Sequence, residues 1–223
     1  MKLHLEIRAA EGGDDSKLFV RDLAQAYQTL FAKLGWIATQ IDVRPGELHL
    51  AVEGKDLSGL YNEPGGHRIQ RVPPTERKGR VHTSTVTVAV IDPTVVKPTY
   101  SDSDFKIEWY SGTGAGGQNR NKVQASCRLT YIPLGIVQTA QTRSRTNSYE
   151  MAYKKLIEQL DSLHQAHHLS GTSTIRKEQV GSGMRGDKVR TIRFQDNTVV
   201  DHVTGKKMPA NKYMKGGMID LWP

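Results

Sequence analysis

The feature that most restricts the fold is a change of hydrophobic periodicity within the first quarter of the chain. Residues 3–9 alternate apolar and polar side chains, which is the pattern of a half-buried strand. From Phe19 to Leu34 the apolar residues recur at helical spacing, and Gly35 follows as a residue suited to end a helix. Strand patterns return at 37–43 and 48–53, joined by a Pro-Gly turn. This order predicts the α+β class.

Further strand patterns lie on both sides of a second helix. The acidic and hydroxyl residues of 11–16 are candidate N-caps for the first helix. The second helix is predicted to begin at Asn147, because Glu150 three residues later fits a capping box. A polar stretch at 75–80 is predicted to be a loop that leads into the next strand. The remaining predicted strands are 83–90, 105–110, 125–131, 136–140, 189–194 and 198–203.

Two segments of unusual composition predict how the chain is divided. Residues 92–104 are rich in Pro, Ser and Asp, and residues 171–187 are rich in Gly and Ser. We expect the first to be a domain boundary and the second to be a linker. The predicted units are therefore 1–103, to which 188–223 return, and an inserted unit, 104–170.

Charge and cysteine content restrict the partners. Residues 1–103 carry 13 basic and 13 acidic side chains, whereas 104–223 carry 18 and 10, so the net charge of +8 lies in the second half. A basic half favours nucleic acid as a partner, with a basic surface of no such function as an equal alternative. Cys127 is the only cysteine, so no internal disulfide can form, and no apolar run reaches the roughly 18 residues of a membrane span. We expect a cytoplasmic protein without metal, cofactor or membrane contact.

Residues 112–122 form a glycine-rich run, Gly-Thr-Gly-Ala-Gly-Gly-Gln-Asn-Arg-Asn-Lys. Its four glycines allow backbone conformations and close approaches that a Cβ atom would block. The run fits neither a dinucleotide-binding nor a Walker A pattern, and Gln118 can neither titrate nor act as a useful nucleophile. Arg120 and Lys122 indicate an anionic target. Taken alone, the run is better interpreted as a flexible loop.

A second pair of segments changes that interpretation. Residues 67–75 read His-Arg-Ile-Gln-Arg-Val-Pro-Pro-Thr, and residues 80–84 read Arg-Val-His-Thr-Ser. Together with the Gly-Gly-Gln run, they resemble the class I peptide chain release factors of bacteria, specifically the release factor 1 kind. Similar runs continue in family order over nearly the whole chain, among them 6–9, 179–183 and 189–191.

The resemblance implies that Gly116, Gly117 and Gln118 promote hydrolysis of the peptidyl-tRNA ester in the ribosomal peptidyl transferase centre, with water as the attacking species. The backbone N–H of Gln118 would stabilise the oxyanion or the leaving oxygen, and its amide would position the water. Phosphates of rRNA or tRNA would be held by Arg120, Lys122, Arg143 and Arg145. For each of these four, a solvated basic face is an equal alternative.

The resemblance also implies a unit that reads stop codons. Pro73 to Thr75 match the Pro-x-Thr element of factors that read UAA and UAG, and the Thr75 hydroxyl would read the edges of the first two bases. His82 would stack on the second base.

Two further groups of residues complete this implied unit. Gln70 and Thr83 would contact the third base of the codon. The turn from Gly12 to Asp15 would contact the first uridine through its main chain.

The resemblance therefore implies an α+β decoding unit of mixed sheet plus helix, and a separate α+β glycine-glycine-glutamine domain inserted before the final strands. The family usually begins with a further helical domain, which this chain is expected to lack. The lead-in to the run, residues 111–115, is longer than usual, and Asn119-Arg120 replaces a common His-Val pair.

The sequence thus predicts a factor that ends translation at UAA and UAG. Its expected partners are the ribosome with its 16S and 23S rRNA, the mRNA stop codon, peptidyl-tRNA and a glutamine methyltransferase acting on Gln118, and it is expected to be a monomer. One alternative is a ribosome-rescue hydrolase, disfavoured because the chain keeps a decoding unit. The other is a non-catalytic competitor of the host factor, disfavoured because Gln118 is intact.

Overall fold

The structure, a computed structural model of the chain, describes residues 1–94, 99–113 and 122–223. The chain divides into two compact units, here called unit 1 (1–94 with 172–223) and unit 2 (95–171). The first break falls at Thr94 rather than after residue 103. The reason is aromatic packing, because Tyr100 lies edge-on to both Phe105 and Tyr131 of unit 2.

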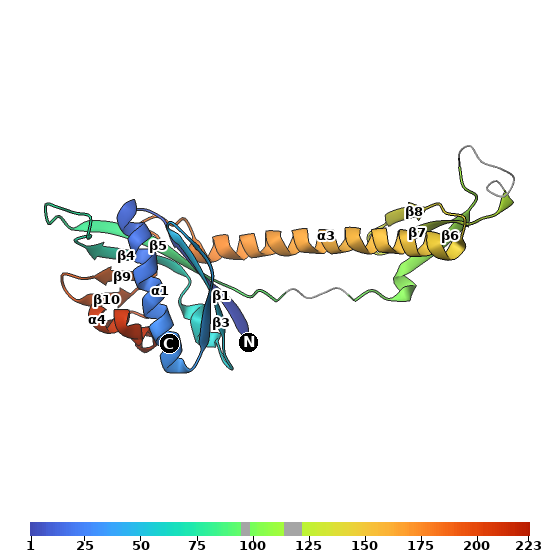
Figure 1. Cartoon of the computed structure of the whole chain (residues 1–223). Helices are drawn as coiled ribbons and strands as arrows, with labels where there is room; N and C mark the ends of the chain where they lie inside the picture. The colour runs from blue at the N-terminus through green and yellow to red at the C-terminus, as the bar shows by residue number, and fades with distance from the viewer. Residues whose placement is uncertain (95–98, 114–121) are drawn as a thin grey trace. The chain divides into compact units, whose positions relative to one another are not determined.

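Unit 1 is built on one sheet with the strand order β11-β10-β9-β4-β5-β1-β3-β2 (Figure 1). β4 and β9 run parallel, and all other neighbouring strands are antiparallel. The predicted mixed sheet is therefore confirmed, and β9, β10 and β11 of the final segment lie in it. The strands are β1 (Lys2–Ala9), β2 (Ile37–Arg44), β3 (Glu47–Glu53), β4 (Gly65–Arg71), β5 (His82–Ile91), β9 (Arg190–Arg193), β10 (Thr198–Asp201) and β11 (Lys207–Pro209).

The helix α1 (Asp14–Leu34) covers one face of this sheet (Figure 1). Its apolar stripe, including Phe19, Leu23 and Leu30, packs into the same buried cluster as the inward side chains of β1 and β5. The prediction that Gly35 ends the helix is confirmed, since its φ of 69° is left-handed. The prediction of a side-chain N-cap is wrong, because the cap residue is Gly13 and, among the described residues, no side chain accepts from the first N–H groups of the helix.

The sequence did not predict β4, β11, η1 or the C-terminal helical turns of unit 1. β4 lacks strict alternation, and it becomes a central strand because it pairs with both β5 and β9. The C-terminal segment forms α4 (Ala210–Lys212), η3 (Tyr213–Gly217) and η4 (Met218–Leu221), while η1 (Ser58–Asn62) precedes β4. Tyr213 and Met218 pack into the same buried cluster as α1.

A buried group of charges lies within the unit 1 core. The Arg190 guanidinium pairs with Glu63, and its Nε donates to Asp201 at 2.9 Å. Burial by itself would raise the pKa of Glu63, but the charge and hydrogen bond of Arg190 hold it below its ordinary value. Tyr27 donates to the same carboxylate at 2.6 Å, and His67 donates from Nε2 to the Glu63 backbone oxygen at 3.0 Å. The group joins α1, β4, β9 and β10 to η1.

Unit 2 is a three-stranded sheet in the order β6-β7-β8, with a helix packed on it. The strands are β6 (Phe105–Tyr110), β7 (Ser126–Tyr131) and β8 (Ile136–Ala140), preceded by η2 (Asp102–Asp104), and they confirm the predicted ones. Leu156 and Leu160 of α3 (Arg145–Val180) are buried with Cys127 and Leu129 of β7.

Both predicted limits of α3 differ from the structure. The helix starts at Arg145 rather than at Asn147, because the Ser144 hydroxyl accepts the Asn147 N–H at 3.5 Å and so takes the capping position. At its other end the helix continues to Val180, so the prediction of a linker over 171–187 is wrong for residues 171–180.

Tertiary contacts explain why these Gly- and Ser-rich residues are helical. Arg176 donates from Nε and Nη2 to both oxygens of Glu6, at 2.6 and 2.7 Å. The Gln179 amide accepts from the Val90 N–H and donates to the Val90 carbonyl, at 2.8 and 2.9 Å. These contacts attach the end of α3 to β1 and β5, which overrides weak local propensity. In the described part of the chain, no helix is both long and apolar enough to span a membrane.

Candidate functional site

The loop between β4 and β5, residues 72–81, contains the predicted Pro-x-Thr element. The Pro73 carbonyl accepts the Glu76 N–H at 3.0 Å, which closes a turn with Pro74 and Thr75 at its centre. Pro73 is buried, whereas Thr75 is exposed at the turn. Proline at the second position fixes φ in the range that this turn requires. The Thr75 hydroxyl is therefore presented to solvent by a defined backbone.

Glu76 organises the rest of this loop. Its carboxylate accepts the Lys78 N–H at 2.7 Å, Arg80 Nη2 at 2.9 Å and His82 Nε2 at 2.8 Å. The hydrogen bond from Lys78, followed by those from Arg80 and His82, lowers the pKa of Glu76 to about 2. Because an ionised carboxylate only accepts, His82 donates through Nε2, and this bond orients its ring.

Beneath the loop, Asp15 joins the start of α1 to both flanking strands. Its Oδ1 accepts from Arg71 Nε of β4 at 2.8 Å, and its Oδ2 accepts from Ser84 Oγ of β5 at 2.7 Å. Only 3% of Asp15 is exposed. Gly12 has a φ of 121°, and a Cβ atom there would lie 2.8 Å from Ser84 Cα. The side chain of Asp15 thus supports the frame, while the turn from Gly12 offers main chain.

Gln70 and Thr83 lie on the opposite face of the sheet from His82. The register pairs Gln70 with Thr83 and Arg71 with His82, and successive residues of a strand point to opposite faces. Gln70 Nε2 donates to Thr83 Oγ1 over a long 3.5 Å, and Gln70 Oε1 accepts from Arg193 Nε at 3.1 Å. The predicted third-base residues are therefore adjacent, with Arg193 as a neighbour.

All seven residues predicted to read the codon thus lie at one end of unit 1, around the loop 72–81 and the start of α1. They do not share a single face, since His82 is on the α1 side and Gln70 and Thr83 are on the other. Sequence reasoning assigned no role to four residues that shape this end. They are Arg71, Glu76, Ser84 and Arg193. For Arg71, Glu76 and Ser84 the available indication was their position within or beside the motifs, and for Arg193 it was its charge alone.

In unit 2, the predicted catalytic residues and one predicted phosphate ligand lie outside the described residues: Gly116, Gly117, Gln118 and Arg120. Lys122 and Arg143 are described and exposed. Arg145 is engaged within the unit, because its guanidinium lies 5.1 Å from the Trp109 ring and its Nε donates to the Gln124 carbonyl at 2.7 Å.

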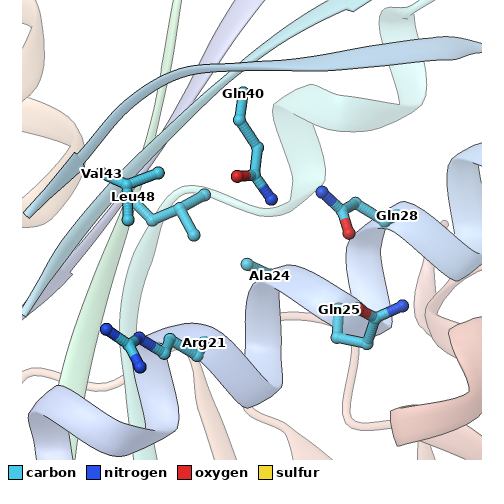
Figure 2. A pocket seen from close by; sticks show the side chains of 7 residues that line it. All are labelled: Arg21, Ala24, Gln25, Gln28, Gln40, Val43 and Leu48. Atoms are coloured by element: carbon cyan, nitrogen blue, oxygen red, sulfur yellow. The ribbon is translucent and has the colours of Figure 1, made fainter.

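A pocket on unit 1 lies away from the predicted residues. Figure 2 shows side chains of α1 facing those of the β2–β3 hairpin across it. The lining is mostly amide and aliphatic, and none of the residues predicted from the sequence contributes to it. The residues are Arg21, Ala24, Gln25, Gln28, Gln40, Val43 and Leu48. Over the described ranges, no three His, Cys, Asp or Glu side chains gather in a way that could hold a metal ion.

Two family models match the chain in sequence order. The PCRF domain matches residues 1–88, and the RF-1 domain matches residues 95–203. The first match covers the described loop and the start of α1, and the second begins where unit 2 begins.

Curated relatives match most of the chain. The chain is 40% identical over 206 residues to peptide chain release factor 1 of Malacoplasma penetrans, covering 89% of this chain and 57% of the relative. It is 34% identical over 232 residues to peptide chain release factor 1 of Acholeplasma laidlawii, covering 97% and 64%. The chain therefore spans about three fifths of the length of these relatives. Among solved structures, RF2 of Thermus thermophilus matches with a TM-score of 0.58 and 26% identity, covering 99% of this chain and 66% of that one.

Proposed function

The chain belongs to the family of peptide chain release factors, and from this premise we propose that it ends translation at UAA and UAG codons on the ribosome. The observation that carries the proposal is the loop 72–81, which exposes Thr75 at a turn and orients His82 through Glu76. A hydroxyl that can donate and accept, beside a fixed aromatic ring, suits the reading of single-stranded bases by edge contacts and stacking.

The proposed roles follow the positions of the side chains. Thr75 reads the first two bases of the codon, and His82 stacks on the second base. Gln70 and Thr83 contact the third base from the other face of the sheet, so that base has to be turned away from the second. The main chain at Gly12 to Asp15 contacts the first uridine, since no side chain among the described residues caps the start of α1 and its first N–H groups can donate.

The proposed reaction is hydrolysis of the ester that joins the peptide to tRNA. Water attacks the ester carbonyl carbon, the bond to the tRNA ribose oxygen breaks, and the products are the free peptide acid and the tRNA hydroxyl. The Gln118 N–H stabilises the negative oxygen, its amide places the water, and Gly116 and Gly117 permit the close approach. The ribosome supplies the rest of the site.

The proposed partners are the ribosome with its 16S and 23S rRNA, the stop codon and peptidyl-tRNA. We also propose that the protein acts as a monomer in the cytoplasm and that a glutamine methyltransferase modifies Gln118. Lys122 and Arg143, both exposed, hold RNA phosphates in this proposal. Arg145 contributes charge at the same end of α3.

The test is single-turnover peptide release from ribosomes that carry labelled peptidyl-tRNA, with UAA, UAG, UGA, a sense codon or no codon in the A site. Release confined to UAA and UAG is the expected result. Release at an empty A site would instead identify a rescue hydrolase. Binding without release at any codon would identify a non-catalytic competitor.

Two variants separate the two proposed activities. Gln118→Ala should leave ribosome binding near that of the wild type and slow release about a hundredfold, as expected for the loss of a group that acts on the transition state. Thr75→Ala should reduce the preference for stop over sense codons. Equal codon preference in Thr75→Ala and the wild type would place the reading of the first two bases elsewhere.

A further inference from the structure

Arg193, Gln70 and Thr83 form a row across three strands of unit 1. Parallel pairing sets Gln70 of β4 beside Arg193 of β9, and antiparallel pairing sets it beside Thr83 of β5. Residues paired in this way share a face of the sheet. Arg193 is exposed, and Gln70 and Thr83 are half-buried, so the row is open to a ligand.

The hydrogen bonds along this row orient the Gln70 amide. Arg193 is a donor only, so its Nε at 3.1 Å requires the oxygen of Gln70 to face it, and the Nε2 group then faces Thr83 Oγ1 at 3.5 Å. The backbone strengthens the frame, since the Phe194 N–H donates to the Gln70 carbonyl at 3.0 Å. The hydrogen bond from Arg193 therefore fixes the orientation of the Gln70 amide, with its oxygen toward Arg193 and its nitrogen toward Thr83.

This arrangement leaves mainly donors for a ligand. Among the described residues, no partner is seen for the two amino groups of Arg193. The bond from Gln70 to Thr83 uses one of the two Nε2 protons and a lone pair of the Thr83 oxygen. The second Nε2 proton and the Thr83 hydroxyl proton therefore remain available to donate to a ligand. The two acceptors of the row, Gln70 Oε1 and Thr83 Oγ1, each already receive a hydrogen bond from a neighbour in the row.

Guanine and adenine differ in what they require from such a row. The outer edge of guanine offers two acceptors, O6 and N7, whereas adenine offers one acceptor and one donor amino group. A guanidinium pairs with both acceptors of guanine at once, but its positive charge disfavours the adenine amino group. The row thus suits guanine better than adenine.

We propose that Arg193 forms a guanine-preferring subsite with Gln70 and Thr83, and that it biases reading of the third codon position toward UAG over UAA. The inference rests on the proposed function, since it assumes that Gln70 and Thr83 meet the third base. Arg193 acts by contact with the base and by fixing the amide of Gln70.

The surrounding charge supports an electron-rich ligand at this place. Arg68 of β4 lies near enough to Arg193 for their charges to interact, and in the described ranges neither forms an ion pair with a carboxylate. Burial, followed by the charge of Arg193, lowers the pKa of Arg68. Two cations without a counter-anion repel each other, and an RNA ligand relieves that repulsion.

The experiment measures kcat/KM for peptide release at UAG and at UAA, using the full chain and programmed ribosomes. The wild type should favour UAG by about tenfold, which is the discrimination of one modest bidentate contact. Arg193→Ala should bring the ratio to about one while release continues at both codons. Arg193→Lys keeps the charge but loses the planar pair of donors, so it should also lose most of the preference.

Lys207→Ala is the matched control, because Lys207 is an exposed cation of β11 in the same sheet and lies outside the row. It should keep the wild-type ratio. A ratio near one in the wild type, or a ratio unchanged in Arg193→Ala, would overturn the inference and leave the proposed function intact. Release at neither codon would overturn the proposed function and the inference with it.

Discussion

Asp15 accepts a hydrogen bond from the Ser84 hydroxyl at 2.7 Å, across 69 residues of sequence. The other oxygen of the same carboxylate accepts from Arg71 Nε at 2.8 Å. One buried side chain therefore holds the start of α1 against the last residue of β4 and the beginning of β5. The loop 72–81 leaves and re-enters the sheet at this point, so its geometry depends on Asp15.

Asp15→Asn should lower the free energy of unfolding by about 2 kcal/mol, because it leaves the buried guanidinium of Arg71 with only its bond to Asp22. Urea unfolding measures this change. The matched control is Asp14→Asn, one residue earlier, whose side chain is 79% exposed and pairs with Lys17. Its effect should stay below about 0.5 kcal/mol. Equal effects of the two substitutions would contradict a supporting role for Asp15.

Gly12→Ala should destabilise unit 1 more than Gly79→Ala does. Both glycines have positive φ, 121° and 67°, but only Gly12 has a neighbour in the way of a Cβ atom, at Ser84 Cα. Gly79→Ala should cost about 1 kcal/mol from backbone strain alone, and Gly12→Ala should cost at least about 2 kcal/mol more. Thermal unfolding of the two variants tests this order. Similar midpoints for both would show that β5 yields to the added methyl group.

Stability should fall as the pH falls from about 6.5 to about 4, because of His67. Burial, reinforced by the nearby charge of Arg190, lowers the pKa of His67 from 6.5 to about 4. Between these values the unfolded chain binds more protons than the folded chain, so acid favours unfolding. The loss of folding free energy reaches about 3 kcal/mol at low pH, and it is absent above pH 6.5.

The variant His67→Gln isolates this contribution. It should be less stable than the wild type at pH 7.5, but its stability should change less between pH 6.5 and pH 4. Urea unfolding at several pH values gives both curves. Parallel curves would mean that other groups cause the acid sensitivity.

Arg145→Ala should loosen the sheet of unit 2. The substitution removes the contact with the Trp109 ring and the hydrogen bond to Gln124, with an expected cost of about 1–2 kcal/mol. Hydrogen exchange in β6 and β7 should accelerate about tenfold. Exchange in β1 and β5 of unit 1 serves as the internal control and should keep its rate. Acceleration in both units alike would point to global rather than local destabilisation.

Arg143→Ala should act on ribosome binding and not on stability. Arg143 is exposed, and among the described residues it has no ion-pair partner. If it holds a phosphate, its loss should reduce the slope of log affinity against log salt by about 0.7–1, equally at every codon. An unchanged slope would identify Arg143 as part of a solvated basic face.

Much of the fold could be predicted from local patterns. The alternation over residues 3–9 and 83–90 gave β1 and β5, and helical spacing followed by Gly35 gave α1. These predictions succeed because one face of each element is buried along its length, so the period is written into the sequence. The predicted C-terminal end of α3 was wrong because Arg176 and Gln179 are held by Glu6 and Val90, which no local pattern reveals.

In the candidate site, too, some features could be predicted from the sequence and others required the tertiary structure. The sequence by itself determined which residue types stand in the loop 72–81 and the glycine-rich run, and with them the resemblance to release factors. Only the tertiary structure decided that Glu76 orients His82 and that Arg193, 123 residues from Gln70, completes its row. The physical reason is that the parallel register of β4 and β9 is set by the packing of the whole unit, including the buried Arg190 and Glu63, and not by either strand alone.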